Sequence, residues 1–400
     1  MKNILLTLLL VLSLCAENNE TTMQKKEISF YDKDDGMLDA SEFLSETYGF
    51  LPVPVLITEP AIGYGGGLGL VYFHDKFLGN KSASGRSIPT SITALFAMAT
   101  ENGTKAGGLA HMGYYLEDRL RTVTFAIYSD INVDTYINDD IPIAANMNGP
   151  VFYQAVKYRI KETGLFLGAG FVYSDLENSL NDGSVTLPKP GLPPSNITIP
   201  TLSSDKMAAA QLIAEYDTRD NTLSPTSGYF LNFKANFFDE ALGGDMDFQR
   251  YMLKSFFYLP VTSKLNINFN IGADTMANTD ENTPFYAYPF INLRGLPVMG
   301  VQGEHALATE LEVCWSFTPR WEGLVFGGAG TVFGTSQIAK YNEATGYDQS
   351  FGDAHVYPTG GVGFRYLVAK KFGLKVGVDI ATSELDDAFY IQVGSAWAGI

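Results

Sequence analysis

Side chains that could carry out acid–base or nucleophilic chemistry are sparse in this sequence. The four histidines are scattered along the chain, without the spacing of a metal site: His74, His111, His305 and His355. One polar loop combines Ser350, Asp353 and His355, the residue types of a hydrolase. A hydrolase would need these groups to converge at one rim, with the histidine hydrogen-bonded to the serine. Proximity in the sequence does not predict that arrangement, so we expect no enzyme, no metal site and no cofactor.

The segment Asp32–Glu42 contains the aspartates and the glycine that a calcium-binding loop uses. Counted from Asp32, however, the glycine is the fifth residue and the glutamate is the eleventh, whereas such a loop has them sixth and twelfth. No apolar-periodic helix precedes the segment either. We therefore predict a solvated acidic segment, with a short helical turn at Asp39–Leu44.

Arg294 is the charged residue with the most unusual surroundings. It lies in a run rich in Gly and Pro, Pro284–Gly303, that is too irregular for a strand, whereas the next segment, Ala308–Phe317, alternates in polarity. Because successive residues of a strand point to opposite faces, Glu310 and Glu312 share one face. This pattern indicates a loop held by an ion pair, and the loop must fold inward if that face lines the interior of a barrel. The alternative is an exposed turn in which the arginine is solvated.

The strands that would position this loop alternate in the manner of a membrane barrel. In Leu265–Ala273, aliphatic and aromatic side chains share one face and three asparagines share the other. Lipid outside and water inside demand this pattern, although a strand of a soluble sandwich also alternates. About sixteen such segments follow one another, and an even number brings both chain ends to the same side. We predict an all-β fold: a transmembrane antiparallel β-barrel of about 16 strands with an inward-folded lid loop.

The composition and the start of the chain fit an exported membrane protein. Residues 1–16 combine Lys2, an apolar core of about eleven residues and Cys15-Ala16, which predicts a signal peptide, with acylation of Cys15 as an alternative. Residues 17–60 are predicted to be a polar periplasmic lead-in and residues 61–400 the barrel. No apolar run is long enough for a membrane helix. A net charge of -17 argues against nucleic acid as a partner.

Three ordered motifs between residues 205 and 400 resemble the BamA/TamA-type bacterial surface antigen barrels. They are a hairpin that resembles the family's DTRDN…P..G pattern, a loop that resembles its arginine-glycine-aromatic signature with leucine in place of the aromatic, and a GxGxRY…LD strand pair near the C-terminus. The matching residues are Asp217, Arg219, Asp220 and Gly228 in the hairpin, Arg294, Gly295 and Leu296 in the loop, and Gly363, Arg365 and Asp379 in the strand pair.

The resemblance implies a set of partners for the loop arginine. In the family this arginine pairs with a glutamate on the next strand, which is Glu312 here, and with an aspartate on the strand after, where this chain has Gly328. We therefore predict about 1–2 kcal/mol of coupling between Arg294 and Glu312 in a partly wet lumen. A Gly328→Asp variant is expected to add a second partner and to tighten the loop.

The resemblance also implies a function in inserting or translocating proteins at the outer membrane of a Gram-negative bacterium. The protein would be a short member of the family without periplasmic substrate-collecting domains, because the lead-in is too short for one. Its expected partners are outer-membrane lipid and other outer-membrane or secreted proteins. Two alternatives stay open: a stand-alone surface barrel that acts as a pore or structural protein, and an outer-membrane enzyme.

Overall fold

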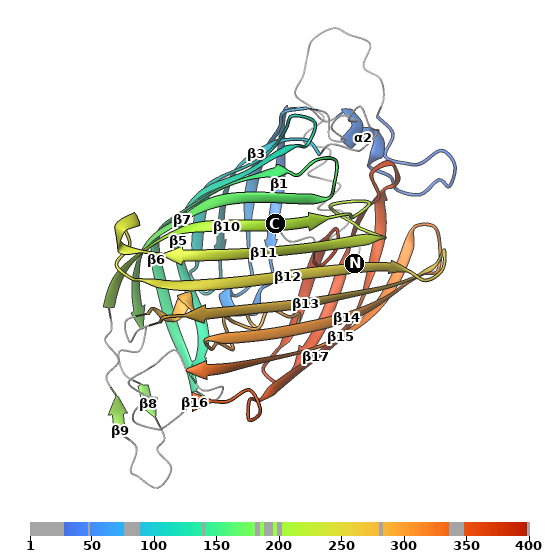
Figure 1. The fold of residues 1–400 in the computed structure, drawn as a ribbon. Coiled ribbons are helices and arrows are strands. Elements are labelled where there is room, and N and C mark those ends of the chain that lie inside the picture. Colours follow the sequence, from blue (N-terminus) through green and yellow to red (C-terminus); the bar gives the residue numbers. More distant parts are fainter. Residues whose placement is uncertain are drawn as a thin grey trace.

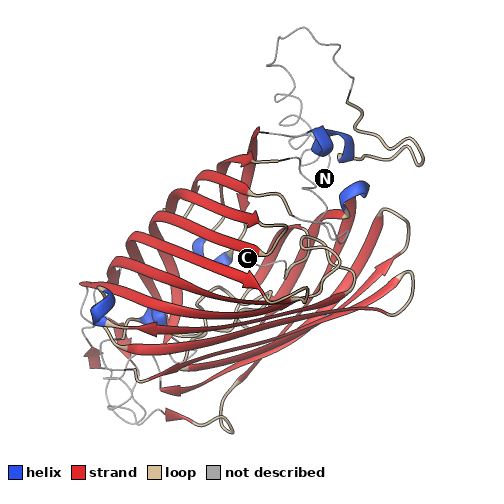
Figure 2. Cartoon of the chain, turned by 45° about the horizontal axis from the view of Figure 1, so that its top comes forward, coloured by secondary structure: helices blue, strands red, loops and turns tan. Residues whose placement is uncertain are grey.

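Long antiparallel strands dominate the computed structural model, which describes residues 28–46, 49–75, 89–137, 141–180, 185–187, 195–197, 202–279, 283–335 and 348–397. The strands wrap around a common axis as a barrel (Figure 1), and the helices are short (Figure 2). Within these described residues sixteen strands form the wall, which confirms the prediction of an all-β barrel of about 16 strands. No described helix is long and apolar enough to cross a membrane.

The elements have the following bounds. The wall strands are β1 Gly49–Ile57, β2 Gly65–Phe73, β3 Ile92–Thr100, β4 Lys105–Tyr115, β5 Leu120–Ile137, β6 Ile141–Arg159, β7 Leu165–Leu180, β10 Leu202–Asp217, β11 Gly228–Phe238, β12 Phe248–Pro260, β13 Leu265–Ala277, β14 His305–Ser316, β15 Trp321–Thr335, β17 Val356–Ala369, β18 Leu374–Ser383 and β19 Asp387–Val393. The remaining strands are β8 Val185–Leu187, β9 Ser195–Ile197 and β16 Asp348–Gln349. The helices are α2 Ser41–Glu46 and the 3-10 turns η1 Pro60–Ile62, η2 Glu240–Leu242, η3 Phe285–Ala287 and η4 Lys370–Phe372.

Each wall strand pairs antiparallel with the next wall strand in the chain, from β1–β2 through to β18–β19. The β8–β9 hairpin and the short β16 lie outside this sequence of pairs, because β7 pairs directly with β10 and β15 with β17. The wall is not closed by a ladder: among the described residues β1 pairs only with β2, and β19 pairs only with β18. We call the boundary between β1 and β19 the seam.

The barrel begins earlier than the sequence indicated. Residues 49–57, placed by the sequence in the lead-in, form β1, so the boundary predicted at residue 61 is wrong. Pro52 and Pro54 favoured an extended entry over a strand, but prolines are tolerated in a strand whose N–H side faces no partner. Val53, which lies between the two prolines, directs its carbonyl oxygen toward Gly69 of β2. Because neighbouring residues of a strand direct their backbone groups to opposite edges, the nitrogens of Pro52 and Pro54 face the edge away from β2.

The two faces of the wall differ in polarity as a membrane barrel requires. On β14, Leu311 is 49% exposed and Trp315 57% exposed, whereas Glu310 is 1% exposed and Glu312 5% exposed. Apolar side chains therefore cover the outer surface, and the carboxylates point into the lumen. The alternation predicted for this strand places the two glutamates on the inner face, where a loop that folds inward can reach them.

The acidic segment ahead of β1 was predicted to be solvated, but it packs on the barrel at one end and is not solvated throughout. Helix α2 packs Leu44 against Ala369 and Phe372, at the turn between β17 and β18. The helix does coincide with most of the expected helical turn. The sequence could not show this packing, because the apolar residues that receive Leu44 come more than 300 positions later in the chain.

Candidate functional site

The connection between β13 and β14 folds back into the barrel, and we call its residues 283–304 the inner loop. Its apolar side chains lie in clusters with residues from widely separated wall strands: Phe285 and Val298 with Val133 and Met147, Tyr288 with Phe248 and Met276, and Leu293 with Val332 and Tyr357. Since these strands stand on different sides of the wall, the inner loop crosses the lumen. Arg250 adds a polar anchor, donating from Nη1 to the carbonyl oxygen of Ala287 over 3.0 Å.

Arg294 lies at the centre of a buried group of carboxylates. Its Nη2 is 2.6 Å from Glu310 Oε1 and 2.9 Å from Glu312 Oε2, and its Nη1 is 2.8 Å from Asp379 Oδ2. The arginine side chain is 8% exposed, and those of Glu310 and Asp379 are 1% and 0% exposed. The guanidinium carbon also lies 3.6 Å from the centre of the Phe326 ring, a cation–π arrangement. We call Arg294, Glu310, Glu312 and Asp379 the carboxylate cage.

Two strands supply the carboxylates of the cage. Glu310 and Glu312 are two residues apart on β14, so the period of the strand directs both inward. Asp379 comes from β18, where it faces Gly363 of β17 across the ladder. A Cβ at position 363 would lie 2.0 Å from Asp379 Oδ1, so only glycine leaves room for the carboxylate. Arg365 then binds the same carboxylate from the other side, with Nη1 2.6 Å from Oδ1 and Nη2 2.9 Å from Oδ2.

Gly295 joins the inner loop to the last hairpin of the wall. Its N–H donates to Tyr390 Oη over 3.1 Å, and its carbonyl oxygen accepts from Ser383 Oγ over 2.7 Å. Its φ is +97°, and a Cβ there would lie 3.0 Å from the carbonyl oxygen of Thr382, so the contact favours glycine on both counts. Leu296 is 3% exposed and packs in the apolar cluster of Leu293 and Val301.

The C-terminal residues also reach the cage. After β19 the chain turns at Gly394, and the Ser395 N–H donates to the carbonyl oxygen of Leu223 over 2.7 Å. Trp397 then lies inside the barrel, stacked on Phe256 with ring centres 6.1 Å apart. Its Nε1 donates to Glu310 Oε1 over 2.8 Å. The segment after the last strand thus contributes an aromatic residue to the same site as the inner loop.

The hairpin motif lies in a different place from the cage. Asp217 accepts from Arg219 Nε over 3.0 Å, at the end of β10, and Arg121 Nη1 lies 3.5 Å from its other oxygen. Asp220 accepts from the N–H groups of Thr226 and Ser227 and so closes the turn in which Gly228 begins β11. Asp217, Arg219, Asp220 and Gly228 thus order the β10–β11 turn, and none of them contacts Arg294 in the described structure.

Some residues of the site were missed by the sequence analysis. Glu310 was recognised as sharing a face with Glu312, but it was not predicted to bind Arg294. Trp397, which lies beyond the end of β19, was not predicted to contribute to the site. A further buried group, in which Asp118 binds both Arg121 and Arg159, was not predicted either, because Arg159 lies 41 positions beyond Asp118 in the chain.

The residues weighed for hydrolase chemistry are not brought together. Ser350 Oγ donates to Asp353 Oδ2 over 2.7 Å, but His355 Nε2 lies 2.6 Å from Glu384 Oε1 instead. Over the described part of the chain, no three His, Cys, Asp or Glu side chains are grouped so as to hold a metal ion.

The cage reverses one expectation from the sequence. Arg294 already binds three carboxylates, so an aspartate at position 328 has no vacancy to fill. Gly328 faces Glu310 across the β14–β15 ladder, and a Cβ there would lie 2.8 Å from the carbonyl oxygen of Thr309. We expect Gly328→Asp to lower the urea midpoint of the refolded barrel, because like charges directly opposite each other destabilise a sheet. Gly328→Asn, which adds similar bulk without the charge, should lower the midpoint less. A raised midpoint in Gly328→Asp would instead support the expectation that an aspartate here is a further partner of Arg294.

Residues 201–352 match the model of the Omp85 superfamily domain, whereas curated protein sequences give no match. Among solved structures, the chain is similar to BamA from Haemophilus ducreyi lacking POTRA domains 1-3, with a TM-score of 0.57 and 12% identity over 88% of this chain and 70% of that one.

Two further similar structures are CdiB from Acinetobacter baumannii, with a TM-score of 0.53 and 10% identity over 86% of this chain, and CdiB from Escherichia coli, with a TM-score of 0.51 and 10% identity over 85%. The chain spans 59% and 61% of the length of these two proteins. The resemblance seen in the sequence is therefore confirmed: residues 201–352 match the model of the Omp85 superfamily domain, and the barrel has the fold of BamA.

Proposed function

We propose that this protein inserts or translocates other proteins at the outer membrane of a Gram-negative bacterium, and that client segments engage it at the seam. The observation that carries the proposal is the absence of a β1–β19 ladder among the described residues, in a wall whose other neighbours are all paired. A strand edge without a partner is costly in lipid and is a template for another strand. An incoming segment can satisfy it by β-augmentation.

The free edge of β1 can pair with an incoming strand only in part. Pro52 and Pro54 remove two N–H donors from this edge but leave their carbonyl oxygens. A segment that pairs there satisfies the edge by donating N–H groups to it. The two missing donors weaken a ladder with β19 and a ladder with a client alike, so we expect pairing at this edge to be reversible in both cases.

The wall is also short on both sides of the seam. β19 has 7 residues and β1, β2 and β3 have 9 each, whereas β5 has 18 and β6 has 19. A tilted strand needs about 9–11 residues to span a bilayer. A shorter strand thins the bilayer around it, at a cost of fractions of a kcal/mol per Å. A thinned bilayer at the seam would lower the barrier to inserting a new strand there.

The inner loop argues against an open pore as the main function. Its apolar clusters tie it to strands on several sides of the lumen, and the cage adds an ionic anchor at its centre. A barrel that conducts freely would need this loop to leave. Client segments are therefore proposed to pass at the seam, with outer-membrane or secreted proteins as the partners.

A seam that can be locked provides the test. Phe50 of β1 and Val393 of β19 are 68% and 63% exposed, and lie at the same end of the barrel because the strand count is even. In a Cys314→Ala background, Phe50→Cys with Val393→Cys can be joined by a bis-maleimide. Depletion of the protein should lower the amounts of other outer-membrane proteins. The unlinked double-cysteine variant should restore them, and the cross-linked variant should not.

Each single-cysteine variant, treated with the same reagent, is the matched control for chemical damage. Equal restoration by the cross-linked and the unlinked barrel would reject client entry at the seam. An outer-membrane proteome that does not change on depletion would reject the proposed function itself and would favour a pore or structural protein.

A further inference from the structure

The segment that precedes β1 does not bind beside β1. Its residues 28–46 bind the turn between β14 and β15 and the turn between β17 and β18, both on the β19 side of the seam. In Figure 1, α2 lies at the top of the barrel, close to the upper end of the red C-terminal strands. Since β1 follows this segment after a two-residue gap in the description, 47–48, the chain connects the two sides of the seam.

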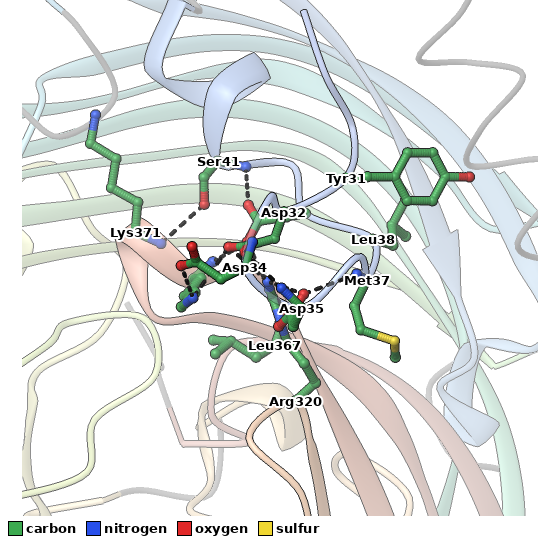
Figure 3. A network of polar contacts seen from close by, with 12 residues as sticks. Tyr31, Asp32, Asp34, Asp35, Met37, Leu38, Ser41, Arg320, Leu367 and Lys371 are labelled. Atoms are coloured by element: carbon green, nitrogen blue, oxygen red, sulfur yellow. Dashed lines mark hydrogen bonds and ion pairs between the residues drawn. The ribbon is translucent and has the colours of Figure 1, made fainter.

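Arg320, in the turn between β14 and β15, makes the ionic contact with residues 28–46 (Figure 3). Its guanidinium lies 2.6 Å from Asp35 Oδ2, 2.7 Å from Asp39 Oδ2 and 3.1 Å from Asp32 Oδ2. The arginine side chain is 3% exposed, so the aspartates enclose it. The sequence pattern that resembled a calcium loop thus surrounds a guanidinium, and the three carboxylates gain charge-assisted hydrogen bonds or ion pairs from it.

Backbone contacts fix the same segment in one register. The N–H of Ala40 donates to the carbonyl oxygen of Val368 over 2.7 Å, and Tyr366 Oη donates to the carbonyl oxygen of Leu38 over 2.6 Å. The N–H of Lys371 donates to Ser41 Oγ over 3.0 Å. With Leu44 packed on Phe372, the segment has ionic, backbone and apolar contacts with β17 and η4.

From this arrangement we propose that residues 28–46 are a latch across the seam: they hold the start of β1 to the β14–β15 and β17–β18 turns and limit how far β1 and β19 separate. The inference rests on the proposed function, because a latch matters only if the seam opens. It follows from topology. β1 has no ladder to β19. Among the described residues, two segments therefore connect the β1 side of the seam directly to the β19 side: residues 28–46, and the inner loop, whose Val298 N–H donates to Glu59 Oε1 just after β1.

The ionic part of the latch is formed at neutral pH. Hydrogen bonds from the Asp34 backbone and from Arg320 hold the pKa values of Asp32 and Asp35 below the usual value, despite some desolvation. The pKa of Asp39 is raised by burial, but hydrogen bonds from Ser41 and Arg320 outweigh this and leave it lowered. Stability that comes from lowered aspartate pKa values is present above about pH 4 and is lost in more acidic solution. Arg320, Lys370 and Lys371, with Asp34, complete the charged groups at this contact.

Cross-linking across the seam tests the latch. In the Phe50→Cys and Val393→Cys background, Arg320→Gln removes the partner of three aspartates. It should lower the bis-maleimide cross-linking yield at limiting reagent by about tenfold or more, since one charge-assisted bond alone accounts for about tenfold. Asp35→Asn leaves the barrel sequence unchanged and should act in the same direction. Arg119→Gln is the matched control, because the Arg119–Glu162 pair lies at another turn with side chains 51% and 63% exposed. Its yield should equal that of the parent.

Unchanged yields in both Arg320→Gln and Asp35→Asn would overturn the latch. A lower yield in Arg320→Gln but not in Asp35→Asn would assign the effect to the β14–β15 turn itself. That result would reject the latch as well. The measurement is made on purified barrel and is separate from the depletion experiment. If the substitutions lower the cross-linking yield as expected but depletion leaves the outer-membrane proteome unchanged, the proposed function is rejected. The contact between residues 28–46 and the two turns would then still stand.

Discussion

Replacing Arg294 with alanine is expected to destabilise the barrel more than any other single change in the inner loop. The variant leaves Glu310, Glu312 and Asp379 buried near one another without the guanidinium between them. Removing one partner of a buried pair costs roughly 3–5 kcal/mol, because the remaining charge is uncompensated. We expect a loss in this range from urea midpoints of the refolded barrel, read with an unchanged slope. The inner loop should also become accessible to protease.

Arg119→Ala is the matched control for this experiment. Arg119 binds Glu162 at a barrel turn where both side chains are about half exposed, so its loss should cost within about 1 kcal/mol. A loss in Arg294→Ala as small as in the control would mean that the cage is hydrated in solution. Arg294→Lys should recover part of the loss only, since one ammonium cannot bind carboxylates from two strands in the fixed geometry of a guanidinium.

Asp379→Asn is expected to have the second large effect. This carboxylate is 0% exposed and accepts from two arginines, Arg294 and Arg365, so the amide leaves both guanidinium groups short of a charge. The side chain keeps its shape, and the loss of roughly 3–5 kcal/mol is therefore electrostatic. Urea midpoints should show it, and the Arg294→Ala/Asp379→Asn double variant should lose less than the sum of the two single variants.

Asp387→Asn provides the comparison, because Asp387 is an exposed aspartate at the start of β19. It should leave the midpoint nearly unchanged. Strictly additive losses in the double variant would show that Arg294 and Asp379 do not interact in solution. The same experiment with Glu312→Gln should give a smaller loss than Asp379→Asn, because Glu312 binds one arginine and Asp379 binds two.

The wall of the barrel could be predicted from the sequence because its cause is local. Alternation of apolar and polar residues follows from the period of a strand, and lipid on one side with a polar lumen on the other imposes it on each strand separately. Leu311 and Glu310 illustrate this: adjacent in the chain, they are 49% and 1% exposed. The prediction failed where the local signal is ambiguous. At β1, Pro52 and Pro54 gave the segment the composition of a linker, but it forms an edge strand.

Apart from Glu312, the partners of the buried charges were decided by the tertiary structure. The sequence placed Arg294 beside a strand with carboxylates, but Asp379 is 85 positions away from it, and Trp397 lies 87 positions beyond Glu310. Arg320 and Asp35 are separated by 285 positions. Such contacts depend on which strands the barrel brings across the lumen or around the seam, and no local period encodes that. The sequence by itself therefore determined a membrane barrel with an inward loop as its expectation, and the arrangement of the strands around the lumen determined which charges meet.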